Sequence, residues 1–199
     1  MKILLHICCA PCAIYPYRRL REEGFDVSGY FYNPNIHPYQ EYQKRLVTVQ
    51  EFSGIVGCEV QYRDEYDLDS FLSCIVGRGA SRCEHCYRMR LDAAGGATRK
   101  NGIALMTTSL LYSRYQQHDL IIGLGKEMAS EHGVEFYYED FRQGWHKGIN
   151  ESKIMGLYRQ QYCGCLYSER ERFEKTPQAR NKDLRKHNQT CLNEHNDRC

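Results

Sequence analysis

Three cysteine clusters, far apart in the chain, constrain the fold more than any other feature of the sequence. The clusters lie within HICCAPC, RCEHC and QYCGC and contribute seven thiols: Cys8, Cys9, Cys12, Cys83, Cys86, Cys163 and Cys165. Neighbouring thiolates can bind one metal centre because their side chains reach a common point. Clusters so far apart in the sequence can bind the same metal only if the fold brings them close in space. We therefore expect a fold that brings the three segments to one place, with a metal bound there.

Length and cysteine usage indicate a reduced compartment. A chain of 199 residues suits one domain with a single core. Its eleven cysteines are an odd number in a chain too long for a small disulfide scaffold, and the apolar start at residues 3–7 is too short for a signal peptide. No stretch is long and apolar enough to span a bilayer. We expect a cytoplasmic protein with reduced thiols and no membrane contact.

Short apolar runs alternate with amphipathic segments along the chain. The sequence predicts strands at residues 2–7, 25–32, 58–62, 103–109 and 134–138, and helices at residues 13–23, 39–53, 68–75, 83–100, 116–132 and 150–157. Strands that alternate with helices form a parallel sheet, because each crossover helix returns the chain to the same edge. We expect an α/β fold with a parallel sheet and helices on both faces.

The composition changes near residue 173, after which apolar residues become rare. We therefore predict a metal-binding catalytic domain at residues 1–173 and a polar tail at residues 174–199. From Arg170 onward the chain has 8 Lys and Arg against 5 Asp and Glu, so the tail is basic. The tail also contains four possible soft-metal ligands at intervals of four residues, a spacing that chance in a polar tail explains better: His187, Cys191, His195 and Cys199.

The first cysteine cluster follows the first predicted strand and precedes the first predicted helix. In open parallel sheets, ligands bind beyond the carboxyl ends of the strands. Free amide groups at a helix start favour thiolates over thiols, which suits both metal ligation and a low thiol pKa. Asp140 and Arg142 follow the fifth predicted strand, so we expect them at the same edge. Helix capping by Asp140 is an equally good interpretation of that residue.

Metal binding explains the clusters better than the alternatives do. Inert buried thiols would require three coincidental clusterings. Cys9 and Cys12 form a C-x-P-C pair typical of a dithiol oxidoreductase, but such an exchanger leaves five thiols without a role. Seven ligands exceed what one zinc ion takes, whereas iron with sulfide uses three or four and leaves the others for a second metal. Cys58 and Cys74 stand alone, and we interpret them as packing residues.

Five motifs occur in order along the predicted domain. They are CCAPC at residues 8–12, RCEHCYRMRL at 82–91, TTSLLYSRYQ at 107–116, DFRQG at 140–144 and YRQQYCGC at 158–165. Together they resemble the cobalamin-independent epoxyqueuosine reductases, the QueH family, from about residue 1 to residue 173. Five blocks in one order are far more specific than any single cysteine pair.

The resemblance implies reduction of the epoxide of epoxyqueuosine to the alkene of queuosine in the wobble position of a tRNA anticodon, the last step of tRNA queuosine biosynthesis. It also implies a fold like that of the adenine nucleotide alpha hydrolases (HUP) and a 4Fe-4S cluster beside a single iron. All seven clustered thiols carry over as metal ligands, and we assign Cys12 to the single iron. The other six are then candidate cluster ligands: Cys8, Cys9, Cys83, Cys86, Cys163 and Cys165. The implied partners are the tRNA anticodon loop and an unidentified electron donor.

Reduction of an epoxide takes two electrons and two protons, so the site needs a proton source. Asp140, Arg142 and Tyr158 are the candidate catalytic residues, while Tyr112 and Tyr115 are candidates for stacking on an extruded base. With sixteen tyrosines in the chain, plain packing is an alternative for each tyrosine. A metal-free dithiol oxidoreductase, or a carrier of metal or electrons, is the alternative function.

Overall fold

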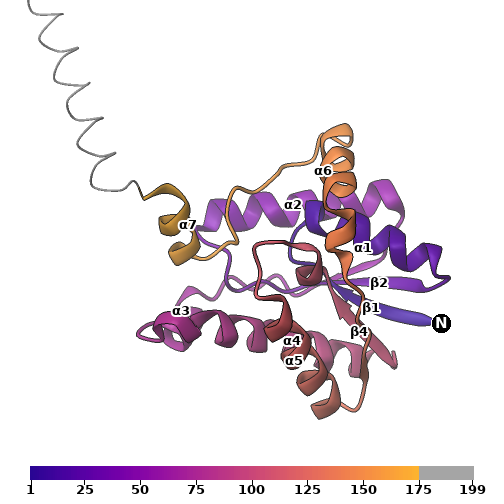
Figure 1. The fold of residues 1–199 in the computed structure, drawn as a ribbon, viewed down its shortest axis with the longest axis horizontal. Coiled ribbons are helices and arrows are strands. Elements are labelled where there is room, and N and C mark those ends of the chain that lie inside the picture. The colour runs from indigo at the N-terminus through magenta and orange to yellow at the C-terminus, as the bar shows by residue number, and fades with distance from the viewer. Residues whose placement is uncertain (175–199) are drawn as a thin grey trace, which may run out of the picture.

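A computed structural model describes residues 1–174 as helices wrapped around one sheet (Figure 1). The sheet contains β1 (Lys2–His6), β2 (Asp26–Phe31), β3 (Val60–Tyr62), β4 (Leu105–Thr108) and β5 (Glu135–Phe136). All pairings are parallel, in the order β3-β2-β1-β4-β5. The strand order changes direction at β1, so the first cysteine cluster follows the strand where an open parallel sheet binds its ligands.

Helices cover both faces of the sheet, as predicted. They are α1 (Ala10–Glu22), α2 (Tyr39–Val56), α3 (Leu68–Ile75), α4 (Arg82–Lys100), α5 (His118–Glu131), α6 (Trp145–Ile154) and α7 (Leu166–Phe173), with 3-10 turns η1 (Gly79–Ser81), η2 (Ser109–Tyr112) and η3 (Phe141–Gly144). In Figure 1, α1, α2 and α6 lie on one side of the sheet, and α3, α4 and α5 lie on the other. α7 follows the third cysteine cluster at one end of the molecule.

A network of buried polar groups joins the carboxyl ends of the central strands. The ring of His6 lies 2.9 Å from Thr108 Oγ1 through Nδ1 and 3.2 Å from the carbonyl oxygen of Tyr32 through Nε2. Asn33 Nδ2 donates to the carbonyl oxygen of Ile7 at 2.9 Å. Buried hydrogen bonds of this kind fix the local geometry because an unpaired polar group would be costly there. The loop that starts at Cys8 therefore leaves the sheet from a rigid base.

Two helices differ from the prediction near the third cysteine cluster. The helix predicted at residues 150–157 begins at Trp145 and ends at Ile154, because Gly148 is accommodated within it against the ring of Tyr112. α7 was not predicted, because none of its residues is buried and its sequence therefore has no apolar stripe. α6 packs against Tyr112, and α7 is capped by Cys165, so neither helix depends on a local pattern that the sequence shows.

The predicted polar tail lies almost entirely beyond residue 174. Its possible metal ligands lie outside the described residues: His187, Cys191, His195 and Cys199. Within residues 1–174, no helix combines the length and hydropathy needed to cross a bilayer.

Candidate metal centre

Cys8, Cys9 and Cys12 form one group of sulfurs, here the thiol triad, at the carboxyl end of β1. The three sulfurs lie within 4.8 Å of one another, and 3.8 Å separates Cys8 Sγ from Cys9 Sγ. Cys9 caps the start of α1 and Cys12 lies in its first turn. In residues 1–174 no other three His, Cys, Asp or Glu side chains gather so closely. A short loop after one strand thus presents three soft ligands to a single point.

The thiol triad favours one negative charge. Hydrogen bonds with the Cys12 and Cys9 thiols hold the pKa of Cys8 well below its usual range. The same bond to Cys8 is the main cause that raises the pKa of Cys12, while burial is the main cause that raises the pKa of Cys9. Of the three thiols, Cys8 therefore loses its proton most readily, and a soft metal that displaces the other two protons gains three sulfur ligands.

Cys83, Cys86, Cys163 and Cys165 form the second group, here the four-thiol group. The first two lie at the start of α4, and the other two lie in the loop before α7. Cys86 is buried, Cys83 and Cys165 are partly buried and Cys163 is exposed. Burial, followed by charge repulsion from thiolates of the other segment, raises the pKa of Cys83 and raises that of Cys86 to about 12. Four free thiols that repel one another as thiolates suit a centre that supplies positive charge.

Arg45 of α2 holds the loop that carries the third cysteine cluster. Its side chain is 2% exposed, and its guanidinium donates to the carbonyl oxygens of Cys163, at 2.8 Å, and Tyr162, at 3.1 Å. Arg45 Nε donates to Glu41 Oε1 at 2.8 Å, so the buried positive charge is paired. Because Glu41 fixes the guanidinium, the two N–H groups that donate to the loop have a defined position.

Gly164 lets the same loop lie close to the segment before α2. Its φ is +143°, and a Cβ at this position would lie 2.8 Å from Asn35 Nδ2 and 3.3 Å from Arg45 Nη1. Its carbonyl oxygen accepts from the backbone amide of His37 at 2.7 Å, and Tyr162 Oη donates to the His37 carbonyl oxygen at 2.5 Å. A residue without a side chain is therefore required between Cys163 and Cys165.

Two glutamine amides reach the cysteine sulfurs, one in each group. Gln160 Nε2 lies 2.6 Å from Cys9 Sγ and 3.6 Å from Cys12 Sγ. Gln116 Nε2 donates to Cys163 Sγ at 3.2 Å, while its Oε1 accepts from the hydroxyl of Tyr87 at 2.6 Å. Both glutamines lie inside the sequence motifs, but an isolated glutamine has no spacing signal that would assign it a role.

The three candidate catalytic residues occupy two places. Asp140 binds Arg142: Oδ1 accepts from the backbone amide and Nε at 3.1 and 2.8 Å, and Oδ2 accepts from Nη2 at 2.6 Å. These bonds hold the pKa of Asp140 below its usual range. Tyr158 Oη donates to Glu41 Oε2 at 2.5 Å, and burial together with that bond raises the pKa of Tyr158 to about 12. Glu41 links Tyr158 to Arg45, whereas Asp140 and Arg142 make no hydrogen bond to a cysteine in the described chain.

The candidate stacking residues have different environments. Tyr112 is buried, and its hydroxyl donates to the Trp145 carbonyl oxygen at 2.8 Å. Tyr115 is 85% exposed, with its ring edge-on to the Trp145 ring at 5.6 Å. The Arg114 guanidinium lies 5.8 Å from the centre of the same indole. Tyr112 therefore packs in the core, and only Tyr115 presents its ring to solvent.

The isolated cysteines belong to neither group. Cys58 is buried with its sulfur 3.7 Å from the carbonyl oxygen of Val27. Cys74 packs against the small apolar cluster that contains Phe71 and Cys86. These contacts agree with the packing roles expected for both.

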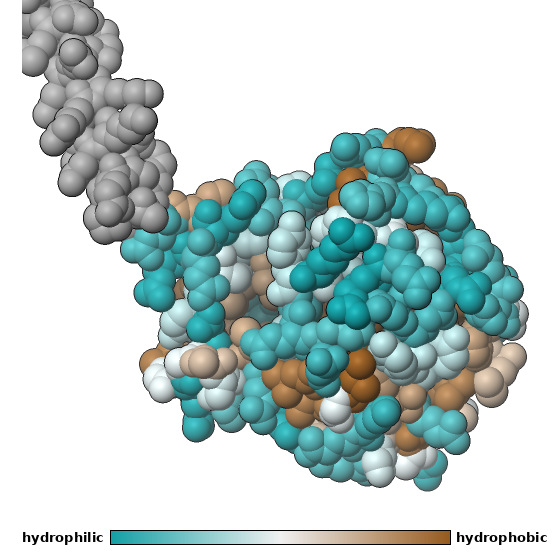
Figure 2. Space-filling model, viewed as in Figure 1, coloured by the Kyte–Doolittle hydropathy of each residue, from teal (hydrophilic) through white to brown (hydrophobic). Residues whose placement is uncertain are grey.

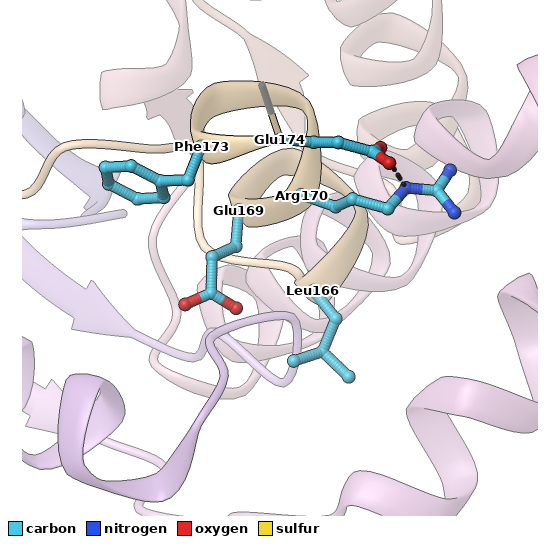
Figure 3. Close-up of a pocket in the computed structure, with 5 residues that line it drawn as sticks. All are labelled: Leu166, Glu169, Arg170, Phe173 and Glu174. Carbon is cyan, nitrogen blue, oxygen red and sulfur yellow. Dashed lines mark ion pairs between the residues drawn. The ribbon is translucent and has the colours of Figure 1, made fainter. Parts of the chain in front are cut away.

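The molecular surface has a separate hollow on α7 that contains no cysteine. The face in Figure 2 is mainly hydrophilic, with apolar residues gathered in its lower half. Five residues of α7 and its end line the hollow in Figure 3: Leu166, Glu169, Arg170, Phe173 and Glu174. Arg170 Nε lies 3.6 Å from Glu174 Oε2. Three of the five lining side chains are charged and none is a soft metal ligand, so this hollow is not a candidate for the metal centre.

Fold and site together define a parallel α/β protein with a reduced, thiol-rich centre at the carboxyl edge of its sheet. A sequence model of the epoxyqueuosine reductase QueH family matches residues 3–171. Epoxyqueuosine reductase QueH of Dehalococcoides mccartyi is 38% identical, over 87% of this chain and 96% of that protein. The enzyme of the same name from Thermotoga maritima is 34% identical, over 87% and 93% respectively. The chain belongs to the epoxyqueuosine reductase QueH family, a family of oxidoreductases, and the resemblance seen in its motifs is confirmed.

A solved structure with the same architecture comes from another class of enzyme. The U34-tRNA thiolase NcsA of Methanococcus maripaludis, solved with its 4Fe-4S cluster, superposes with a TM-score of 0.55 at 15% identity. The match covers 84% of this chain and 61% of that one. It confirms the expected fold, like that of the adenine nucleotide alpha hydrolases.

Proposed function

We propose that this chain reduces the epoxide of epoxyqueuosine in a tRNA anticodon to the alkene of queuosine, the last step of tRNA queuosine biosynthesis. The observation that carries the proposal is the division of seven thiols into two groups within the segment that matches the family. The reaction breaks both C–O bonds of the epoxide, consumes two electrons and two protons, and releases the oxygen as water. The electrons come from an external donor.

We assign the four-thiol group to a 4Fe-4S cluster and the thiol triad to a single iron. This proposal revises the sequence-based assignment, which placed Cys8 and Cys9 with the cluster and only Cys12 with the iron. Four cysteine sulfurs are the usual ligand set of such a cluster, and no three sulfurs of this group lie within 4.8 Å of one another, as ligands of one ion would. The triad sulfurs do lie within that distance, and three protein ligands leave an iron with an open position. When bound, the cluster supplies electrons and the iron polarises the epoxide oxygen as a Lewis acid.

The chain's own residues would orient the sulfurs and supply a proton. The amides of Gln116 and Gln160 donate to sulfur, which fixes the direction of the ligands. Tyr158 keeps its proton at neutral pH and lies two residues before Gln160, so we propose it as the proton donor. Asp140 and Arg142 are held to each other as a rigid ion pair, and we propose that the pair positions the substrate beyond β5.

The exposed aromatic surface formed by Arg114, Tyr115 and Trp145 offers a place for the anticodon loop. Tyr115 directly precedes Gln116, whose amide contacts Cys163 Sγ, so a base stacked on the tyrosine lies at the edge of the four-thiol group. Unpaired bases of a loop bind by such stacking. We place the reaction in the cytoplasm, where reduced thiols persist.

The test is a turnover assay with anaerobically prepared protein and tRNA that contains epoxyqueuosine. Dithionite supplies the electrons, and mass spectrometry of the digested nucleosides follows the reaction. We expect loss of one oxygen from the modified nucleoside, and no conversion by Cys163→Ser. Reduction of small disulfides without any conversion of the tRNA would overturn the proposal in favour of a dithiol oxidoreductase.

A further inference from the structure

Arg90 of α4 is the largest side chain that is fully buried, with 1% of its surface exposed. Its Nη1 lies 3.9 Å from Cys86 Sγ, and its Nη2 donates to Asn33 Oδ1 at 2.8 Å. The side chain therefore extends from the four-thiol group to the loop after β2. Asn33 in turn donates to the carbonyl oxygen of Ile7, directly before the thiol triad. Arg90 thus lies between the two groups.

No carboxylate balances this charge. In residues 1–174, no Asp or Glu oxygen lies within ion-pair distance of Arg90, and its Nε has no hydrogen-bond partner. The other buried arginine of the site, Arg45, is paired with Glu41. Because an isolated buried charge is strongly disfavoured, the partner of Arg90 must be another anionic group in its surroundings.

The groups around Arg90 that can become anionic are cysteine sulfurs from both groups. Burial works against the charge of Arg90, yet its pKa is raised because negative charge on the Cys86, Cys8 and Cys163 sulfurs, which metal binding would supply, favours the charged form. Arginine keeps its proton under all ordinary conditions, so this positive charge is permanent. A cation fixed beside ligand sulfurs acts on whatever metal they hold.

We propose that Arg90 is the shared counter-charge of the two thiol groups and that it raises the reduction potential of the cluster in the four-thiol group. The inference rests on the metal assignment proposed above. The potential of an iron-sulfur cluster depends on net charge, hydrogen bonds to sulfur and exposure. An added electron makes the centre more negative, and a cation beside Cys86 stabilises that form. The step transfers one electron from a donor, with no bond made or broken.

The test is a dye-mediated dithionite titration of anaerobically reconstituted protein, followed by electron paramagnetic resonance. In Arg90→Met the one-electron reduction equilibrium should shift at least tenfold against the reduced form, a fall of about 59 mV. Arg90→Lys keeps the charge and should stay near the parent. Arg88→Met is the matched control, because Arg88 lies on the same helix, partly exposed and paired with Glu127, and its loss should not change the potential.

A second variant tests the charge without removing the arginine. Asn33→Asp places a carboxylate against Arg90 Nη2 and should lower the potential in the same direction. If Arg90→Met assembles no cluster, the potential of Asn33→Asp alone tests the role of the Arg90 charge. An unchanged potential in Asn33→Asp or Arg90→Met overturns the inference, as does loss of the cluster from Arg90→Lys, which would indicate a packing role. A parent protein that holds no cluster would instead refute the proposed metal assignment.

Discussion

The thiol triad and the four-thiol group are built in opposite ways. The triad comes from one loop between β1 and α1, so the backbone of a single segment brings its sulfurs together. The four-thiol group combines the start of α4 with a loop from the far end of the chain, and Arg45 of α2 holds that loop by two carbonyl bonds. Local geometry therefore makes the first site, whereas tertiary contacts make the second. The second should be the more sensitive to changes at a distance.

The largest expected effect comes from removing one ligand of each group. Cys163→Ser should lose most of the iron and acid-labile sulfide. Turnover should fall at least about 100-fold, because losing a ligand costs more than losing a residue that only hydrogen-bonds to a ligand. Cys12→Ser should lose one iron and keep the sulfide. Cys58→Ser is the control, since that thiol is buried away from both groups and should leave the metal content intact. Equal iron loss in all three variants would contradict the division into two sites.

The next effect concerns the loop that holds Cys163 and Cys165. Gly164→Ala should cost about 1–3 kcal/mol, because its backbone conformation is strained for alanine and the new Cβ meets Asn35. Sulfide content and the thermal midpoint should both fall, while the iron bound by the triad stays. Gly123→Ala in α5 is the control: nothing lies near its Cβ, so the change should be neutral or stabilising by up to about 1 kcal/mol. Full sulfide in Gly164→Ala would show that the loop tolerates displacement.

The smallest effect is a pH dependence of stability from His37, beside the same loop. Burial lowers the pKa of His37 to about 4, below its unfolded value of about 6.5. The folded protein therefore binds this proton less readily, and the stability present above pH 6.5 declines as the pH falls towards 4, by up to about 3 kcal/mol. His37→Phe keeps the ring contacts with Tyr66 and Phe71 and removes the titration.

The measurement for His37 is the thermal midpoint of the loaded protein between pH 7 and pH 4.5. The variant should show a shallower decline than the parent. Parallel declines in the two proteins would exclude His37 as a source of acid sensitivity.

Features that depend on one segment of the chain could be predicted from the sequence, and features that depend on tertiary contacts could not. The alternation of strands and helices followed from apolar runs such as residues 2–7, because that signal is local. The sequence predicted one gathering point for all seven thiols, and the separate group of Cys8, Cys9 and Cys12 was not predicted. α7 has no buried residue, so no periodicity predicted it. The roles of Arg45 and Arg90 were equally hidden, because each depends on partners from distant segments.

The most direct test of two separate metal sites is the iron and acid-labile sulfide content of the anaerobically purified protein, measured alongside Cys12→Ser. We expect about five irons for about four sulfides in the parent, and about four of each in the variant. Zinc without sulfide, or equal iron and sulfide in the parent, would contradict this expectation.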